Sequence, residues 1–286
     1  MNKAVRRLGC ERLDVALNTL ENAGRSELVH DVRKEIKKLR AVLRLVRSDI
    51  GDETYAEYTK TLRGAAGRLT ALRDAEVRVG AFDSLAKNLH GKRGKHRPFP
   101  EIKSALRDLC RAEESKLFKG DALASVRDTL SSSKEQFENL KVNSRGWKAI
   151  YPGLKKIYRR NRKMFDAADQ EPSPKNFHEW RKRVKDLSNQ LRLFRRARPR
   201  KLRGRMDDLD KLGDLLGDDH DLFMLNEFVS RKFNHAPDVR MFEDLIAARQ
   251  KELRAEALKL GGQFYEKPSR FCRKIEDYWK DWRRGG

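Results

Sequence analysis

Histidine, arginine and lysine recur at the same spacing in two segments of the chain that lie 148 residues apart. The first segment covers residues 30–47 and the second covers residues 178–195. Nine of the 18 aligned positions are identical, and six of those nine are basic or histidine. Ammonium, guanidinium and protonated imidazole groups all donate hydrogen bonds and carry positive charge. The repetition therefore predicts an internal duplication and a site for an anionic ligand.

The helical phase of each segment separates its basic side chains from its apolar ones. At about 100° per residue, the shared basic positions fall in one sector of a helix and the apolar positions fall opposite. This division is typical of an amphipathic helix that buries its apolar face. A merely solvated basic face is the alternative, but solvation requires only polarity, whereas like charges on one face repel each other. The predicted anion-binding residues are His30, Arg33, Lys34, Lys37 and Arg44 in the first segment and His178, Arg181, Lys182, Lys185 and Arg192 in the second.

Two basic residues of the first segment are not basic in the second. Lys38 corresponds to Asp186, and Arg40 corresponds to Ser188. We call the basic face that the two segments share the basic stripe. We interpret these two positions as lying off it and leave them out of the predicted site. The stripe of the second segment is thinner than that of the first, because fewer basic residues flank it. Arginines in the regions that precede the two segments are secondary candidates. These are Arg6, Arg7, Arg159 and Arg160.

The charge of the chain points to an anionic partner. Its 286 residues carry a formal net charge of +23, and charged and hydrophobic residues make up 38% each. Such an excess of positive charge destabilises a folded protein by self-repulsion unless an anion balances it. Nucleic acid, an anionic membrane surface and inorganic phosphate polymers are therefore the partner classes to consider.

Other classes of site have little support in the sequence. Three widely spaced cysteines (Cys10, Cys110 and Cys272) predict neither a disulfide framework nor a cysteine zinc site. We find no nucleotide-binding glycine motif, and we predict no metal and no cofactor. The first residues lack the apolar core of a signal peptide, and no apolar run is long enough to cross a bilayer. We expect a cytoplasmic protein.

Helical periodicity runs through nearly the whole chain, whereas alternating strand patterns are almost absent. The sequence predicts an all-α protein made of two similar bundles, residues 1–145 and 146–286. Basic loops at 87–97 and 195–205 could extend the path of an anion. The predicted helices lie near residues 2–22, 28–48, 53–78, 80–89, 100–118 and 121–141, and near 147–168, 175–196, 202–217, 219–233, 238–261 and 268–283.

A second and weaker repeat supports the pairing of the two halves. Leu62, Leu69 and Asp74 match Leu209, Leu216 and Asp221 at an offset of 147 residues. The two aspartates are either partners for the basic stripes or ordinary surface carboxylates. Glycines in these helices cost about 1 kcal/mol each relative to alanine, so we expect close packing against the basic helices to offset them. The glycines are Gly64, Gly67, Gly213 and Gly217.

These features resemble the CHAD family, whose name stands for conserved histidine α-helical domain. The resemblance covers essentially the whole chain and implies two four-helix bundles related by a pseudo-twofold axis, whose basic helices line a central cleft or pore. It also implies binding of inorganic polyphosphate and association with polyphosphate granules. Some family members carry an added triphosphatase domain with a Glu-x-Glu-x-Lys strand, and this chain has no such triplet. The residues that carry the resemblance are His30-Asp-x-Arg-Lys-x-x-Lys-x-Leu-Arg, His178-Glu-x-Arg-Lys-x-x-Lys-x-Leu, the pair Arg73-Asp74, the pair His220-Asp221, and Tyr158-Arg-Arg-Asn-Arg162.

Two other functions are compatible with parts of the sequence. A nucleic-acid-binding protein would share the positive charge, but zinc-finger spacing, aromatic RNA-recognition motifs and basic regions leading into heptads are absent. A metal-dependent phosphohydrolase is suggested by the His-Asp pairs at 30–31 and 220–221, but the six histidines have no metal-ligand spacing. We therefore expect non-enzymatic binding of a phosphate polymer, with nucleic acid bound only nonspecifically.

Overall fold

The computed structural model describes residues 1–93, 99–194, 199–234 and 237–284. Within these ranges the chain forms twelve helices and no strand, which confirms the all-α prediction. None of these helices combines the length and the apolar character that a membrane span needs. The helices are α1 (Asn2–Asn22), α2 (Arg25–Leu45), α3 (Arg47–Ile50), α4 (Asp52–Arg68), α5 (Thr70–Arg93), α6 (Pro100–Lys119), α7 (Ala122–Asn139), α8 (Trp147–Gln170), α9 (Pro174–Leu193), α10 (Pro199–Phe233), α11 (Pro237–Phe264) and α12 (Pro268–Arg284).

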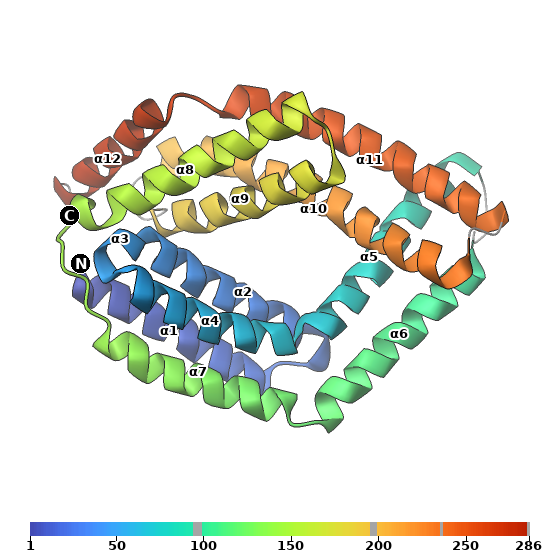
Figure 1. Cartoon of the computed structure of the whole chain (residues 1–286), viewed down its shortest axis with the longest axis horizontal. Helices are drawn as coiled ribbons and strands as arrows, with labels where there is room; N and C mark the ends of the chain where they lie inside the picture. Colours follow the sequence, from blue (N-terminus) through green and yellow to red (C-terminus); the bar gives the residue numbers. More distant parts are fainter. Residues whose placement is uncertain (94–98, 195–198, 235–236, 285–286) are drawn as a thin grey trace.

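The helices form two groups on opposite sides of the molecule (Figure 1). In one group α1 packs against α2 and α7, and α4 packs against α2 and α7. In the other, α9 packs against α8 and α10, and α11 packs along α10. Helix α5 reaches across to α10, while α2 contacts both α8 and α9. The two basic helices, α2 and α9, thus meet where the two groups join.

The apolar faces of α2 and α9 are buried, as their periodicity predicts. On α2, Val32, Ile36 and Leu39 are all 0% exposed. On α9, Trp180 and Leu187 are equally inaccessible to solvent. Burial of a large aliphatic or aromatic side chain stabilises a fold by about 1.5–3 kcal/mol. The hydrophobic core therefore fixes the rotation of each basic helix about its axis and turns its basic side chains outward.

The predicted helix at 53–78 is in fact two helices that meet at Leu69. The carbonyl oxygen of Ala66 accepts hydrogen bonds from the Thr70 hydroxyl at 3.0 Å and from Arg33 Nη1 at 2.6 Å. Leu69 lies outside the α-helical region, with φ −97° and ψ 3°. The backbone N–H of Leu69 donates to the same oxygen at 3.3 Å, so side-chain and backbone donors share it at this turn. The chain then continues as α5 through the predicted helix at 80–89.

The predicted break near residue 218 does not exist, because α10 is continuous from Pro199 to Phe233. Aspartate disfavours helix interiors when its carboxylate bonds to its own backbone. In α10, Asp219 instead accepts a hydrogen bond from Arg254 Nε at 2.6 Å, and Gln250 donates to its carbonyl oxygen at 2.9 Å. Both partners belong to α11, so tertiary contacts override the local signal for a break.

The expectation that glycines pack closely against the basic helices is wrong at Gly64, Gly67 and Gly217, and at Gly213 an added Cβ would make only an ordinary contact with Val184 of α9. An added Cβ would meet nothing within 4 Å at Gly67 or Gly217, and only ordinary contacts at 3.7 Å at Gly64 and Gly213. The close approach is at Gly153 of α8, where a Cβ would lie 2.1 Å from the carbonyl oxygen of Leu45. A glycine is required there because the backbones of α8 and α2 touch.

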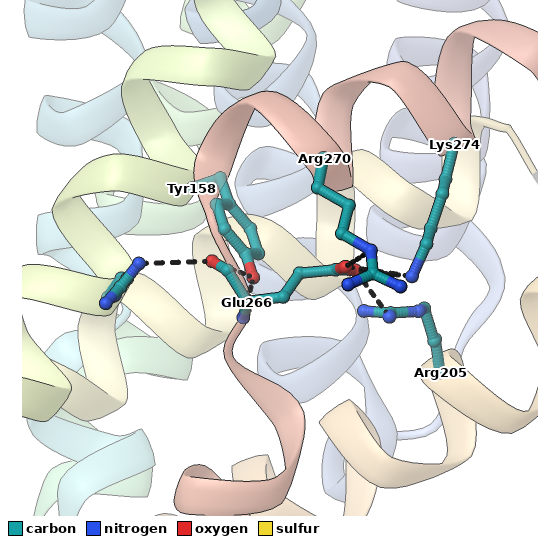
Figure 2. A network of polar contacts seen from close by, with 6 residues as sticks. Tyr158, Arg205, Glu266, Arg270 and Lys274 are labelled. Atoms are coloured by element: carbon teal, nitrogen blue, oxygen red, sulfur yellow. Dashed lines mark hydrogen bonds and ion pairs between the residues drawn. The ribbon is translucent and has the colours of Figure 1, made fainter.

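Glu266 lies in the connection from α11 to α12 and binds cations from neighbouring helices (Figure 2). Its carboxylate is 2.5 Å from Arg205 Nη2, 2.8 Å from Lys274 Nζ and 3.3 Å from Arg270 Nε. Its backbone N–H donates to the Tyr158 hydroxyl at 2.9 Å. We call these five residues the Glu266 corner. Glu266 joins α10 and α12 through its carboxylate and α8 through its backbone.

Candidate anion-binding cleft

A cleft of about 760 Å³ lies between α2, α3, α4, α8 and α9. Its lining contains many basic side chains and one carboxylate, that of Asp186. Both helices with the predicted basic stripes contribute, so residues from the two halves of the chain line the same cavity. The basic side chains are Lys37, Arg40, Arg44, Arg47, Lys60, Arg63, Lys156, Arg160, Arg181, Lys182, Arg183 and Lys185.

Some of these cations are already paired with carboxylates. Asp186 of α9 accepts a hydrogen bond from Arg44 of α2 at 2.6 Å and another from Arg183 at 3.0 Å. The Arg44–Asp186 pair links the two basic helices directly. Arg47, Arg181 and Lys182 also lie within 4.0 Å of a carboxylate oxygen.

The other cations of the cleft have no carboxylate within 4.0 Å among the described residues. Their charges are not balanced by these residues. Arg40 and Lys185 are half-buried, and the other five are exposed to solvent. Electrostatic interactions are stronger at half-buried groups than on an open surface, and like charges that line one cavity repel each other. We call this set the unpaired cations, and it consists of Lys37, Arg40, Lys60, Arg63, Lys156, Arg160 and Lys185.

Two lysines show how unfavourable this concentration of charge is. Burial within the protein, followed by the nearby charges of Lys185 and Arg33, lowers the pKa of Lys37 to about 8. Burial and the charge of Arg181 likewise lower the pKa of Lys185 to about 8. Lys37 is still reached by solvent through the cleft. An anion that enters the cleft would offset the repulsion and favour the protonated form of both lysines.

Helix α8 forms the wall opposite α2 because Gly153 lets the two backbones touch. Lys156 and Arg160 follow Gly153 by one and two helical turns, and both line the cleft. A larger residue at position 153 would push this wall away from α2, since the Leu45 carbonyl oxygen occupies the space that a side chain needs.

Six of the predicted residues line the cleft, whereas three from the start of α2 lie beyond it. Arg33 Nη1 donates to Ala66 O and to Thr70 Oγ1 at 2.7 Å, so its guanidinium holds the junction of α4 and α5. Lys34 is exposed and lies 3.4 Å from Asp31. His30 is largely exposed. Partial burial of its ring and, after that, the charge of Arg73 lower its pKa. The predicted residues that line the cleft are Lys37, Arg44, Arg160, Arg181, Lys182 and Lys185.

His178 faces another histidine instead of the cleft. Its Nδ1 lies 3.2 Å from Nδ1 of His220 on α10, so one imidazole donates and the other accepts. Burial, then the charges of Arg181 and His178, lower the pKa of His220 to about 3. Burial, then the charges of Lys182 and Arg181, also lower the pKa of His178. Asp221, beside His220, lies 3.6 Å from Arg181 Nη2, as expected for a partner of the second stripe.

Four remaining candidates lie away from the cleft. Arg6 Nε donates to the Leu140 carbonyl oxygen at 2.8 Å, and Arg7 lies 3.5 Å from Glu11. Arg192 pairs with Asp210 at 2.9 Å and lines a separate, more apolar cavity with Arg7. Arg159 is exposed and does not line the cleft. The candidate loops at 87–97 and 195–205 lie partly outside the described residues.

The sequence-based choice of residues missed Arg40, Asp186 and most of the wall from α4 and α8. Arg40, which was left out of the predicted site, also lines the cleft. At about 100° per residue it is about 60° from Lys37, the same separation as Lys34 on the other side. Lys38 does lie off the stripe, since its Nζ binds the buried Glu35 at 2.5 Å. A search for basic residues three or four apart would have found Lys60 with Arg63 and Lys156 with Arg160.

Among the described residues, no group of three or more histidine, cysteine, aspartate or glutamate side chains is placed to hold a metal ion. The model of one protein family, the CHAD domain, matches residues 10–230. This range contains both basic helices and every residue that lines the cleft. A search among curated proteins found no match.

Proposed function

Since this chain belongs to the CHAD domain family, we propose that its cationic cleft binds inorganic polyphosphate and does not hydrolyse it. The observation that carries this proposal is the set of unpaired cations, which have no carboxylate partner within the described part of the chain. Polyphosphate carries about one negative charge on each internal phosphoryl group and has no other functional groups. Guanidinium groups hold two phosphate oxygens at once, and ammonium groups supply compact charge, so the two types together suit such a chain.

The lining of the cleft favours phosphate polymers over nucleic acid. Proteins that bind single-stranded nucleic acid stack bases on exposed aromatic rings. Tyr55 is the one aromatic residue among those that line the cleft, and the guanidinium of Arg47 lies over its ring at 4.4 Å. A base would find a single ring there, with a guanidinium already over one face, whereas phosphoryl groups would find unpaired cations.

The architecture that accompanies this function is also a proposal. Residues 1–145 and 146–286 would be two four-helix bundles related by a pseudo-twofold axis. The equivalent places of α2 and α9, each packed on a preceding helix and each lining the cleft, support it. The cleft would then be one part of a central channel, and the protein would lie in the cytoplasm on polyphosphate granules.

A competition experiment tests the function. Labelled polyphosphate bound to the protein is challenged with unlabelled polyphosphate or with single-stranded DNA of equal total charge, at increasing salt. We expect DNA to compete poorly at every salt concentration, because the cleft selects the phosphate chain and not charge alone. Equal displacement by DNA would refute selectivity for polyphosphate. Release of inorganic phosphate that stops when a chelator is added would instead show a metal-dependent hydrolase.

A further inference from the structure

A second cavity, of about 510 Å³, lies between α1, α2, α9 and α12, with the beginning of α1 and the end of α12 among its walls (Figure 1). Most of the residues that line it are apolar. The ring centroids of Phe194 and Trp279 are 6.1 Å apart, and those of Trp279 and Trp282 are 5.5 Å apart. Trp282 is 43% exposed, so part of this aromatic wall is in contact with solvent. A volume in this range is typical of sites for small ligands.

The cavity has a cationic end. Arg12 of α1 and Lys38 of α2 both line it, and both bind the carboxylate of Glu35, at 3.4 Å and 2.5 Å. Among the described residues, no other carboxylate lies within 4.0 Å of either cation. The other two cations of the lining, Arg7 and Arg192, each have a carboxylate of their own, at 3.5 Å and 2.9 Å. Two positive charges thus share Glu35, and one positive charge is left over.

The opposite end of the cavity is apolar. Helices α1 and α2 are joined by two residues and pack along each other, so they run antiparallel. The lining residues toward the start of α1 and toward the end of α2 therefore lie on the same side of Glu35. These residues are Val5 and Leu8 on α1, and Val42 and Leu45 on α2. At 1.5 Å per residue, Leu45 lies about 10 Å beyond Lys38, which separates the apolar end from the cationic one.

We propose that this cavity binds a fatty acid, with its carboxylate at Arg12 and Lys38 and its alkyl chain toward the apolar end. A carboxylate carries one negative charge, which equals the surplus at the cationic end. It also accepts charge-assisted hydrogen bonds from both guanidinium and ammonium groups. The alkyl chain would leave water and would cover apolar side chains of the wall. This inference is independent of the proposed polyphosphate binding, which uses other cations.

The test uses decanoate and decanol, whose alkyl chains are alike and whose head groups are charged in one and neutral in the other. Each is titrated into the protein in a calorimeter, below the concentration at which micelles form. We expect wild type to bind decanoate roughly 10-fold more tightly than decanol, as is typical of a charge-assisted contact. Lys38→Gln should reduce this preference to less than about 2-fold, because Glu35 then balances Arg12, whereas Lys38→Arg should retain it. Lys119→Gln makes the same change of charge at an exposed residue outside the cavity and should behave as wild type.

A second variant fills the cavity instead of changing its charge. Ala4 lines the cavity from an exposed position of α1, so Ala4→Trp should block it without disturbing the core, even if Lys38→Gln folds poorly. Both probes should then bind at least about 10-fold more weakly, because their chains lose the apolar wall. Asn189 lines both this cavity and the cationic cleft, so the cleft variant Lys37→Gln/Lys185→Gln is titrated as well. It should bind decanoate as wild type does.

The outcomes separate this site from the cleft. Equal binding of decanoate and decanol by wild type would overturn the proposal and indicate an adventitious additive only. Unchanged binding of decanoate by Ala4→Trp would place the ligand outside this cavity. A loss of decanoate affinity in the cleft variant alone would place the carboxylate in the cleft. Polyphosphate affinity should be the same in Ala4→Trp and wild type, so the proposed function stands or fails separately.

Discussion

The cationic cleft and the Glu266 corner both gather basic side chains, but they treat the charges in opposite ways. At the corner, Arg205, Arg270 and Lys274 converge on one carboxylate, and their charges hold α12 against the body of the protein (Figure 2). In the cleft, the unpaired cations face one another across a cavity whose one carboxylate, Asp186, already binds Arg44 and Arg183. We infer from this difference that cations at the corner stabilise the fold, whereas those in the cleft would bind the proposed polyphosphate.

This contrast has an energetic meaning. Surface ion pairs contribute little to stability, but loss of one partner from a partly buried cluster leaves charges without compensation. Removing a cation from the cleft has the reverse effect, because it relieves repulsion in the unliganded protein. A neutralising substitution in the cleft should therefore lower affinity and slightly raise stability, whereas one at the corner should lower stability and leave affinity nearly unchanged.

The largest expected effect is on affinity, from reversing charge in the cleft. Lys37→Glu/Lys185→Glu should weaken polyphosphate binding at least about 100-fold, since each substitution replaces a favourable contact with a repulsive one. Fluorescence anisotropy with labelled polyphosphate measures the change. Lys119→Glu/Lys251→Glu alters net charge equally at exposed residues outside the cleft and should cost less than about 3-fold, because salt screens distant charges. Equal losses in the two double variants would mean that overall charge, not the cleft, binds the ligand.

The next effect is on stability, at the Glu266 corner. Glu266→Gln should lower the free energy of unfolding by about 2 kcal/mol, because Arg205 and Lys274 lose their shared carboxylate while staying partly buried. Urea denaturation followed by circular dichroism measures it. Polyphosphate affinity at a temperature where the variant is folded should change less than about 2-fold, since the corner residues do not line the cleft. A loss of affinity without a loss of stability would reverse the assignments of the two regions.

A smaller effect is expected from pH. An anion binds the protonated forms of Lys37 and Lys185, whose pKa values near 8 mean that both lose their protons as pH rises from 7 to 9. Affinity should fall by about 10-fold over this range. Lys37→Arg/Lys185→Arg remains charged, so its affinity should change less than about 2-fold. Calorimetric titrations at each pH test this, and an equally steep profile in the arginine variant would assign the dependence to other groups.

The smallest effect is a gain in stability from neutralising the cleft. Without polyanion at pH 7, Lys37→Gln/Lys185→Gln should raise the free energy of unfolding by a few tenths to about 1 kcal/mol, allowing for solvent screening. The folded pKa of each lysine lies below its unfolded value, so the unfolded chain binds more protons between about pH 8 and 10.5. Wild-type stability then rises with pH in this window, and the gain should shrink by pH 10. A variant less stable than wild type at pH 7 would contradict the claim of repulsion.

Sequence patterns predicted the helices well where hydrophobic periodicity decides the structure. The apolar faces of α2 and α9 are buried as expected, and most helix ends lie within a few residues of the predicted ones. The errors occur where contacts distant in sequence decide. Arg33 supplies a donor at the break after Arg68, and Arg254 binds Asp219 and so permits a continuous α10. No local rule contains these partners.

The lining of the candidate cleft was predicted only in part, for a similar reason. Periodicity identified one face of each basic helix, but it could not show which length of that face borders a cavity. Lys37 and Lys185 lie within the cleft, while Arg33 supports a helix junction and Arg192 lies at another cavity. The opposite wall comes from α4 and α8, and Gly153 brings α8 close enough to form it. Such an approach between helices depends on the whole packing of the chain.

The most direct test of the central claim is the salt dependence of polyphosphate binding by wild type, Lys37→Gln/Lys185→Gln and Glu266→Gln. Each cation that contacts a phosphate displaces counterions, and its removal lowers the slope of log affinity against log salt by about 0.7 for a single-stranded polyanion. We expect the slope of the cleft variant to be smaller than that of wild type by roughly 1.4 for two lost contacts, and the slope of Glu266→Gln to equal that of wild type. Identical slopes for all three proteins would show that the unpaired cations of the cleft do not bind the phosphate chain.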